Sequence, residues 1–342
     1  MSTSHIITPT IVGDLQAIFA SLPDSDLLDA LRGPVRRGRP GHDPAILWRC
    51  HVARYVLGVE SVSALLRMLR DNPYIAGAVG IDTPAAMPSQ PTLSRFGTKL
   101  SKKPYAVAVR NVQRGITRRL YEVLPDFGKT VAIDSTTLKG WSNPAKKGKR
   151  GNGVARQRPH VGQISDADAG WAIKQGTRGV KQMTFGFKAH ILADAVYELP
   201  IVVDTSAGNL HDVNKAMPLM AQARFVNSRF LPRYVLADSG YSSQDVRRAM
   251  RQQYHTTPII QPNASHKRAV AQWPPVENWQ ELYAKRSSIE RVNGRLKGFF
   301  ALDAIRVRGR AKVRVHAHLS VMALQARALA FPDRMRACVR GD

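Results

Sequence analysis

The stretch Val131-Ala132-Ile133-Asp134 introduces the pattern that decides the fold, a short apolar run containing β-branched residues. Runs of this length and composition are typical of buried strands. Four similar runs follow, and helical patterns come between or after the later ones. Strands that first lie side by side and then alternate with helices predict an α/β sheet covered by helices. The further runs are 185–192, 199–203, 234–237 and 256–260, and the helical stretches are 211–226, 242–252 and 279–297.

Residues 1–125 have a different pattern, which predicts helices. Asp43 and Ser61 each precede an apolar-periodic stretch of helical length, as N-terminal caps do. A longer helix is expected over 104–123. The predicted organisation is therefore an all-α N-terminal domain, 1–125, followed by an α/β domain, 126–335.

The charge balance indicates the kind of partner. The chain of 342 residues carries 51 lysine and arginine residues against 25 acidic ones, a formal charge of +26. An excess this large predicts a polyanionic partner, and nucleic acid fits best. An anionic membrane is the alternative, but the apolar runs are far shorter than the ~20 residues of a membrane span. Two distant cysteines and no secretory pattern predict a cytoplasmic protein.

Two features of the helical part are candidates for DNA contact. A short helix over 92–96, carrying Arg95, fits the second helix of a helix-turn-helix motif, and it fits an ordinary helical hairpin nearly as well. Arg110, Arg114 and Arg118 follow one another at a spacing of four residues, so they form one basic stripe. This stripe is either a solvated helix face or a face that follows DNA phosphates.

Two basic segments lie outside the predicted elements. Residues 36–40, Arg-Arg-Gly-Arg-Pro, are extended and narrow, so Arg37 and Arg39 could enter a minor groove, while a basic linker is the simpler interpretation. Residues 139–188 contain 11 lysine and arginine residues against two aspartates, with many glycines. We expect 142–182 to be a mobile basic loop that DNA orders.

Two aspartates end short apolar runs. Asp134 follows Val131-Ala132-Ile133, and Asp238 follows Val235-Leu236-Ala237. Catalytic groups and ligands gather where the strands of α/β sheets end. An aspartate at a strand end is also a common turn former, so neither residue is decisive alone.

A polar row on a predicted helix strengthens the case for these aspartates. In Tyr283-Ala-Lys-Arg-Ser-Ser-Ile-Glu-Arg-Val-Asn-Gly-Arg-Leu-Lys297, four polar residues share one narrow helical face beside an apolar stripe. A salt-bridged surface helix explains neither the tyrosine nor the lone acid among cations. The row is Tyr283, Arg286, Glu290 and Lys297, and the stripe is Leu282, Ile289, Val292 and Leu296.

This spacing of Tyr, Arg, Glu and Lys resembles the signature of bacterial insertion-sequence transposases of groups four and five, which belong to the DDE class. The segments 132–136 and 236–241 resemble the two aspartate motifs of this family, and 186–190 and 209–212 resemble segments between them. The resemblance covers roughly residues 35–330. Only 52 positions separate Asp238 from Glu290, which is too short for the β-rich insertion that some members use to form a DNA hairpin.

The resemblance implies a ribonuclease-H-like catalytic domain with a mixed sheet and flanking helices, after a DNA-binding helical domain. It implies that Asp134, Asp238 and Glu290 are the catalytic residues and hold two Mg²⁺ ions, which Mn²⁺ can replace. Asp134 is expected to bridge both ions, with one further ion contact each from Asp238 and Glu290.

The resemblance also implies DNA contacts near the cut. Arg286 and Lys297 are expected to hold phosphates, with Tyr283 packed beside them. Lys188 and His190 are implied as further residues of the active site, although a histidine at the end of a strand is more often structural.

The function implied is that of a transposase, which cuts double-stranded DNA at transposon ends and joins it to target DNA as a homodimer. A domesticated regulator that binds DNA without cutting it is one alternative. A nuclease without strand transfer is another, because it keeps the same carboxylates.

Overall fold

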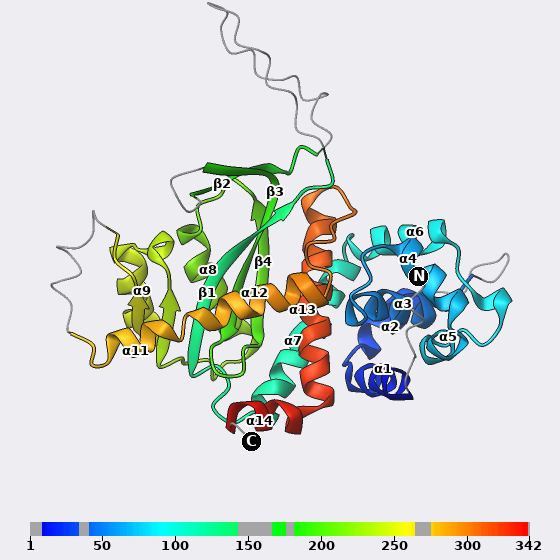
Figure 1. Ribbon diagram of the computed structural model, residues 1–342, viewed down its shortest axis with the longest axis horizontal. Coiled ribbons are helices and arrows are strands. Elements are labelled where there is room, and N and C mark those ends of the chain that lie inside the picture. Colours follow the sequence, from blue (N-terminus) through cyan, green and yellow to red (C-terminus); the bar gives the residue numbers. More distant parts are fainter. Residues whose placement is uncertain (1–8, 34–40, 143–165, 176–180, 264–274, 341–342) are drawn as a thin grey trace, which may run out of the picture.

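The protein consists of a cluster of N-terminal helices beside a helix-covered sheet (Figure 1). The computed structural model describes residues 9–33, 41–142, 166–175, 181–263 and 275–340. The elements described before the first strand are all helices. They are α1 (Pro9–Ser21), α2 (Ser25–Arg32), α3 (Pro44–Val56), α4 (Val62–Asp71), α5 (Pro73–Val79), η1 (Pro84–Ala86), α6 (Gln90–Leu100) and α7 (Tyr105–Val123).

The predicted helix starts are confirmed by their caps. The Asp43 carboxylate accepts from the backbone N–H of Ala45 at 2.9 Å, and the Ser61 hydroxyl from that of Ala64 at 3.1 Å. Each side chain satisfies an amide that has no partner within its own helix, which is why these residues begin α3 and α4.

The rest of the chain forms the sheet and the helices around it. The strands are β1 (Thr130–Lys139), β2 (Gly170–Gln175), β3 (Lys181–Asp194), β4 (Pro200–Ala207), β5 (Tyr234–Ala237) and β6 (Thr257–Ile260). The helices are α8 (Val213–Val226), η4 (Ser239–Tyr241), α9 (Gln244–Tyr254), α11 (Trp279–Ala284), α12 (Ser287–Phe299), α13 (Arg310–Ala330) and α14 (Pro332–Arg340).

The sheet is mixed and β1 is its central strand. The strand order is β2-β3-β1-β5-β6, with β4 paired to β3. The pairs among β1, β2, β3 and β4 are antiparallel, whereas β1–β5 and β5–β6 are parallel. The prediction of a mixed sheet with flanking helices is therefore confirmed.

One strand was expected to be part of a loop. Residues 170–175 form β2 and pair with the first half of β3, so the expectation of a loop over 142–182 is wrong for this part. Residues 143–165 and 176–180 of that loop lie outside the described residues. The β2 pairing depends on a partner strand that the local sequence does not reveal.

Helices cover both faces of the sheet and the side of β4. In Figure 1, α12 crosses in front of the strands, and α8 packs on β3 and β4. Buried amide and hydroxyl groups of α7 and α13 donate to β4 carbonyls: Gln113 and Thr117 to Ile201 O, both at 3.2 Å, and Gln325 to Pro200 O at 2.6 Å. These contacts satisfy polar groups of β4 that a strand edge leaves open.

Helix α13 joins the N-terminal helices to the sheet. It contacts α1, α3, α7 and β4, and most of its 21 residues are buried. At its centre the buried His316 bonds the Tyr55 hydroxyl of α3 at 2.8 Å and the Leu302 carbonyl at 2.9 Å. No helix in the described ranges is long and apolar enough to cross a membrane.

Buried histidines make the folded state sensitive to acid. Burial lowers the pKa of His51, His190 and His316 from 6.5 to about 4, and that of His318 to about 3. The unfolded chain therefore binds protons below about pH 6.5 that the folded chain does not bind until about pH 4. Burial raises the pKa of Asp194 to about 6 and also raises that of Asp24, and both act in the opposite direction, but they are two groups against four.

We predict that the free energy of unfolding falls progressively as the pH drops from 6.5 towards 4. Denaturant titrations at several pH values measure this. His316→Gln should make the dependence shallower, whereas His255→Asn, at an exposed position, should leave it unchanged. A free energy of unfolding that stays level over this range would contradict the prediction.

Candidate active site

Asp134 and Asp238 lie side by side because of the register between two parallel strands. Ile133 pairs with Ala237, the last residue of β5. Asp134 directly follows Ile133, and Asp238 directly follows Ala237. Asp238 caps η4, accepting from the Gly240 amide at 2.9 Å. The expectation that Asp134 ends its strand is wrong: β1 continues to Lys139, paired with β3, and only the pairing with β5 ends before Asp134.

The polar row lies on two helices rather than one. Residues 279–297 were expected to form a continuous helix, but α11 ends at Ala284 and α12 begins at Ser287. Between them, the amides of Lys285 and Arg286 bond carbonyls three residues back, at 3.2 and 2.9 Å, which tightens the turn. The apolar stripe is confirmed in α12, where Ile289, Val292 and Leu296 are fully buried, while Leu282 in α11 is half-buried.

Helix α12 brings Glu290 and Asn293 to the aspartates. The Asn293 side-chain amide donates to the Asp134 carboxylate at 3.0 Å. One turn earlier, Glu290 accepts from the Arg286 guanidinium at 2.6 Å. Burial lowers the pKa of Arg286, but the bond to Glu290 and the charges of Glu290, Tyr283 and Asp134 raise it above its usual value overall. Arg286 is therefore a fixed cation next to two of the three predicted carboxylates.

The ends of the row have partners of their own. The Tyr283 hydroxyl donates to Gln261 at 2.7 Å, and its ring stacks on Trp279 with centroids 4.8 Å apart. The Lys297 ammonium donates to the Thr137 carbonyl of β1 at 3.1 Å and lies 3.3 Å from Asp303. All four residues of the row thus lie along α11 and α12, with Lys297 at the far end.

Two other cations of α12 do not join the row. Arg291 and Arg295 both form ion pairs with Glu198 in the turn between β3 and β4, the Arg295 pair at 2.9 Å. They anchor the helix to the sheet. Their guanidinium groups are therefore engaged within the fold rather than on the face of the row.

A fourth carboxylate lies close to the pair of aspartates. The Tyr241 hydroxyl is buried and has no hydrogen-bond partner among the described residues. Burial, and then the charges of Asp212, Asp134 and Asp238, raise the pKa of Tyr241 well above its usual value. One hydroxyl therefore experiences the charges of three carboxylates, and Asp212, at the N-terminus of α8, belongs to the same region.

Lys188 and His190 contact this fourth carboxylate. The Lys188 ammonium donates to Asp212 and to the Leu210 carbonyl, both at 2.9 Å. His190 bonds the Ser206 hydroxyl at 2.7 Å, and its Nδ1 lies 3.8 Å from Asp212. Burial is the main cause that lowers the pKa of His190 to about 4, so the ring is neutral near pH 7. Both residues therefore lie next to Asp212, one of the three carboxylates whose charges act on Tyr241.

The three predicted carboxylates have the donor atoms that a hard divalent cation requires. Asp134, Asp238 and Glu290 provide the oxygen donors that Mg²⁺ prefers. In the described part of the chain, however, no three His, Cys, Asp or Glu side chains lie close enough together to hold a metal ion. Glu290 is paired with Arg286 instead, and its side chain is 57% exposed.

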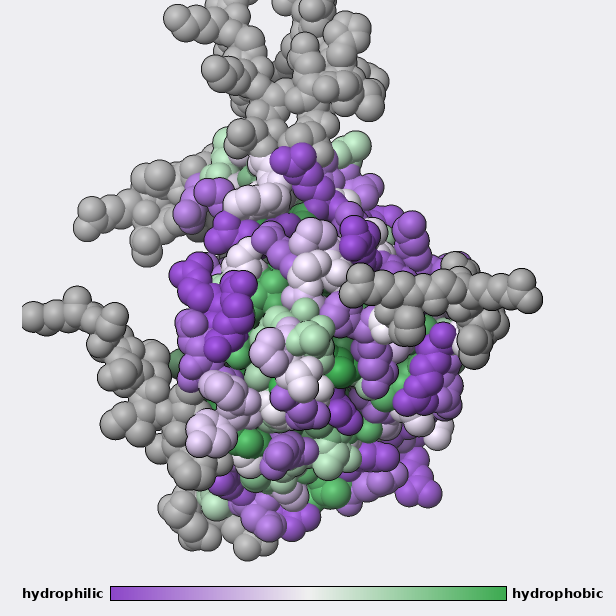
Figure 2. Space-filling view, turned by 90° about the vertical axis from the view of Figure 1, so that its right-hand side faces the viewer, coloured by the Kyte–Doolittle hydropathy of each residue, from purple (hydrophilic) through white to green (hydrophobic). Residues whose placement is uncertain are grey.

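The N-terminal DNA-contact candidates lie in two settings. Arg95 is exposed on α6, beside a shallow hollow lined by Ser94, Thr98, Lys99 and Lys102. Arg37 and Arg39 lie outside the described residues. On the face shown in Figure 2, hydrophilic residues surround a centre of mixed and partly hydrophobic character.

The basic stripe of α7 lies beside the end of α8. The Arg118 guanidinium donates to the Val226 carbonyl at 2.8 Å, and Arg114 lies over the Phe225 ring at 4.5 Å. Arg110 is half-buried and its Nε has no hydrogen-bond partner among the described residues. Arg118 is nevertheless exposed and Arg114 half-buried, so the stripe keeps contact with solvent and both interpretations of it stay predictions.

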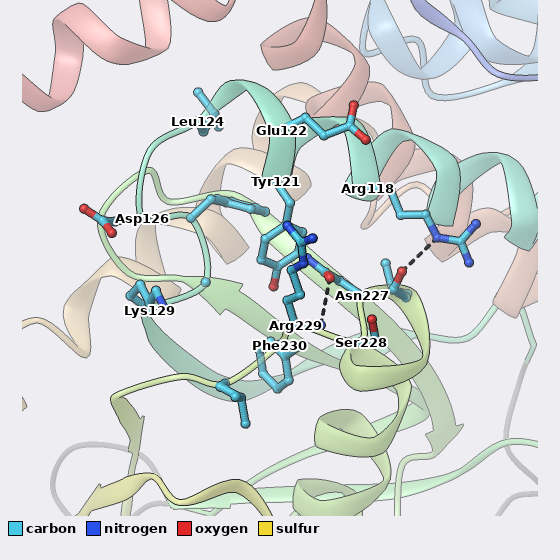
Figure 3. A pocket seen from close by; sticks show the side chains of 14 residues that line it. Arg118, Tyr121, Glu122, Leu124, Asp126, Lys129, Asn227, Ser228, Arg229 and Phe230 are labelled. Atoms are coloured by element: carbon cyan, nitrogen blue, oxygen red, sulfur yellow. Dashed lines mark hydrogen bonds between the residues drawn. The ribbon is translucent and has the colours of Figure 1, made fainter.

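One cavity is away from the carboxylates. It has a volume of about 790 Å³ and lies beside Arg118 and Tyr121 of α7, the residues before β1, and the loop before β5 (Figure 3). Asp134 and Asp238 follow the other ends of the paired segments of β1 and β5. This cavity therefore lies at the opposite end of the β1–β5 pair.

Three residues of the site were not selected from the sequence, or were only noted. Asn293 follows Glu290 by three positions, a helical spacing that could have identified it. Tyr241 lies within the second aspartate motif and also had a local signal. Asp212 was one of several spare carboxylates, and only the packing of α8 against η4 distinguishes it.

We predict that Tyr241→Phe leaves the free energy of unfolding unchanged or raises it by up to about 1 kcal/mol, because it removes a buried hydroxyl without a partner. The matched control is Tyr55→Phe, which removes a hydroxyl bonded to His316 and should lower stability by about 1 kcal/mol. Denaturant unfolding measures both variants. A clear loss in Tyr241→Phe would mean that the hydroxyl has a partner.

Comparison with known proteins identifies the family. A family model described as "Transposase DDE domain" matches residues 125–325, and one described as "Transposase domain (DUF772)" matches residues 12–99. No curated protein matches the chain. A solved structure, "Mos1 transposase paired-end complex with left transposon end", is similar at 12% identity over 92% of this chain and 84% of that chain, with a TM-score of 0.21, too low to inform the fold. The DDE-domain match covers more than half of the chain, so the protein belongs to the transposase DDE-domain family and is a DDE transposase, an enzyme that acts on DNA.

Proposed function

We propose that this transposase binds the inverted repeats at the ends of its own mobile element, cuts the DNA there, and joins the ends to target DNA. The spacing of Tyr283, Arg286, Glu290 and Lys297 supports the proposal that it is an insertion-sequence transposase with the Tyr–Arg–Glu–Lys signature. One observation carries the proposal: Asp134 and Asp238 are adjacent on parallel strands, and α12 crosses β1 with Asn293 bonded to Asp134.

The chain's own residues explain how the site is organised. Asn293 orients the Asp134 carboxylate through its side-chain amide. Arg286 binds the Glu290 carboxylate in the absence of DNA. Asp134, Asp238 and Glu290 would hold two Mg²⁺ ions, which would activate the attacking hydroxyl and stabilise the leaving oxygen. If Glu290 binds the ions, Arg286 would be available to donate two bonds to a DNA phosphate.

The remaining parts of the proposal concern DNA binding. The helices of residues 1–125, with Arg95 of α6 exposed, form a domain that binds the element's ends. Lys297 contacts a phosphate near the cut, and Tyr283 packs beside the DNA strand. A homodimer holds two ends together.

We predict that Asp238→Ala reduces cutting of labelled element-end DNA by on the order of a thousandfold or more in Mg²⁺, because loss of one carboxylate removes several kcal/mol of stabilisation. Binding to the same DNA should persist. The matched control is Asp245→Ala, whose side chain is 91% exposed on α9. If wild-type protein binds but never nicks, or if Asp238→Ala cuts normally, the proposal is wrong.

The joining step separates a transposase from a nuclease. Pre-cut ends with a free 3′-hydroxyl are incubated with plasmid DNA, and joined products are counted. We expect wild-type protein to join them and Asp238→Ala to fail. Cutting without joining would support a nuclease without strand transfer.

A further prediction concerns Lys297. Lys297→Ala should weaken end binding and reduce the slope of log K against log salt concentration by about 1, because one phosphate contact is lost. Lys129→Ala is the control, since this exposed lysine precedes β1 at the other end of the sheet. Equal slopes for the two variants would exclude a phosphate contact by Lys297.

A further inference from the structure

A groove continues from the end of α12 past the end of β1. Two adjoining hollows, of about 300 and 430 Å³, share Lys139, Lys297 and Asp303 among their lining residues. The first hollow also includes Trp141 and Arg306. We call the two hollows together the Trp141 groove.

Trp141 is exposed and held in place. It is 48% exposed, although it is one of the largest apolar side chains in the chain. The Arg306 guanidinium lies over its ring, 4.5 Å from the centroid, and Arg308 donates to its backbone carbonyl at 2.9 Å. One part of the ring is thus covered by a cation and the backbone is fixed, while the rest of the ring faces solvent in the groove.

The charges of the groove fit a nucleic acid strand. Its cations are Lys139, Lys297 and Arg306, and two of them are balanced by acids: Lys297 lies 3.3 Å from Asp303, and Arg306 lies 3.5 Å from Glu60. Aromatic rings among cations are the combination that binds unpaired nucleotides, because bases stack on the rings while phosphates meet the cations.

The Trp141 groove lies a short distance along β1 from Asp134, where the DNA is proposed to be cut. Lys139 follows Asp134 by five residues on the same strand, roughly 17 Å at about 3.3 Å per residue. A DNA strand lying on Asp134 and Lys297 reaches Trp141 within a few nucleotides. In double-stranded DNA the ring faces of the bases are covered by stacking, so Trp141 has no base to stack on. An unpaired nucleotide beside the cut exposes a ring face.

We propose that Trp141 stacks on an unpaired base of the DNA strand that leaves the carboxylates, with Arg306 supporting the ring from its other side. This inference rests on the proposed function and adds to it a subsite for unpaired nucleotides. Its binding energy favours DNA that has been opened or cut over intact duplex.

Two DNA probes of the element-end sequence test this subsite. One is a fully paired duplex, and the other has the same duplex with three unpaired nucleotides at the 3′ end, the last of them 2-aminopurine. Affinities are measured in Ca²⁺ to prevent cutting. Wild-type protein should bind the probe with unpaired nucleotides about tenfold more tightly than the duplex, and stacking should quench the 2-aminopurine fluorescence.

Trp141→Ala should lose both the tenfold preference and the quenching, keeping the duplex affinity, and Trp141→Phe should retain part of each. The matched control is Trp171→Ala, which removes another exposed tryptophan, 38% exposed on β2, and should behave as wild type. Thermal unfolding checks that every variant is folded.

The outcomes separate this inference from the proposed function. No binding of wild-type protein to the duplex would contradict the proposed function itself. Duplex binding without preference for unpaired nucleotides would overturn the subsite alone. The subsite would also be overturned if Trp141→Ala kept the preference for unpaired nucleotides. The same holds if Trp171→Ala lost this preference as fully as Trp141→Ala.

Discussion

The register between β1 and β5 is the constraint on which the site depends. Ile133 lies opposite Ala237, and this pairing brings Asp134 and Asp238 together although 104 positions separate them. Both strands are buried on both faces, so a shift by one residue would exchange the side chains packed on the two faces of the sheet and part the aspartates. The core that fixes this register therefore also fixes the distance between the two carboxylates.

The third carboxylate depends on a different kind of contact. Ile289, Val292 and Leu296 bury one side of α12, and the ion pairs of Arg291 and Arg295 with Glu198 hold its middle against the sheet. Glu290 itself is exposed and is bonded only to the neighbouring Arg286 among the contacts seen. The packing of α12 therefore fixes the helix, whereas the Glu290 side chain is held by its ion pair with Arg286.

Much of the fold was predictable because its signals are local. Asp43 and Ser61 mark the starts of helices through bonds within one turn, and the five apolar runs correspond to strands β1, β3, β4, β5 and β6. What failed depends on distant partners. Strand β2 exists because it pairs with the extended β3, and β1 continues past Asp134 because β3 remains beside it. The tight turn at Arg286 interrupts a helix that periodicity alone makes continuous.

The candidate site was predictable to a similar extent. The spacing of Glu290 and Arg286 identified a helical pair, and the structure joins them. Asp212 and its contact with Lys188 depend on how α8 packs against the sheet, so no spacing in the sequence could identify them. The role of each residue in the reaction remains a prediction, because geometry identifies neighbours rather than chemistry.

The net charge of +26 is not a measure of the number of DNA contacts, because some cations bind within the fold. Arg118 donates to the Val226 carbonyl at the end of α8, and Arg336 donates to the Val123 carbonyl at the end of α7. Helix ends leave such carbonyls without partners within the helix and carry partial negative charge, so a guanidinium there stabilises the fold. In the α7 stripe, Arg114 and Arg118 thus already contact the end of α8, although Arg118 is exposed. The contacts of Lys297 and Arg306, in contrast, lie in an open groove where a phosphate can compete for them.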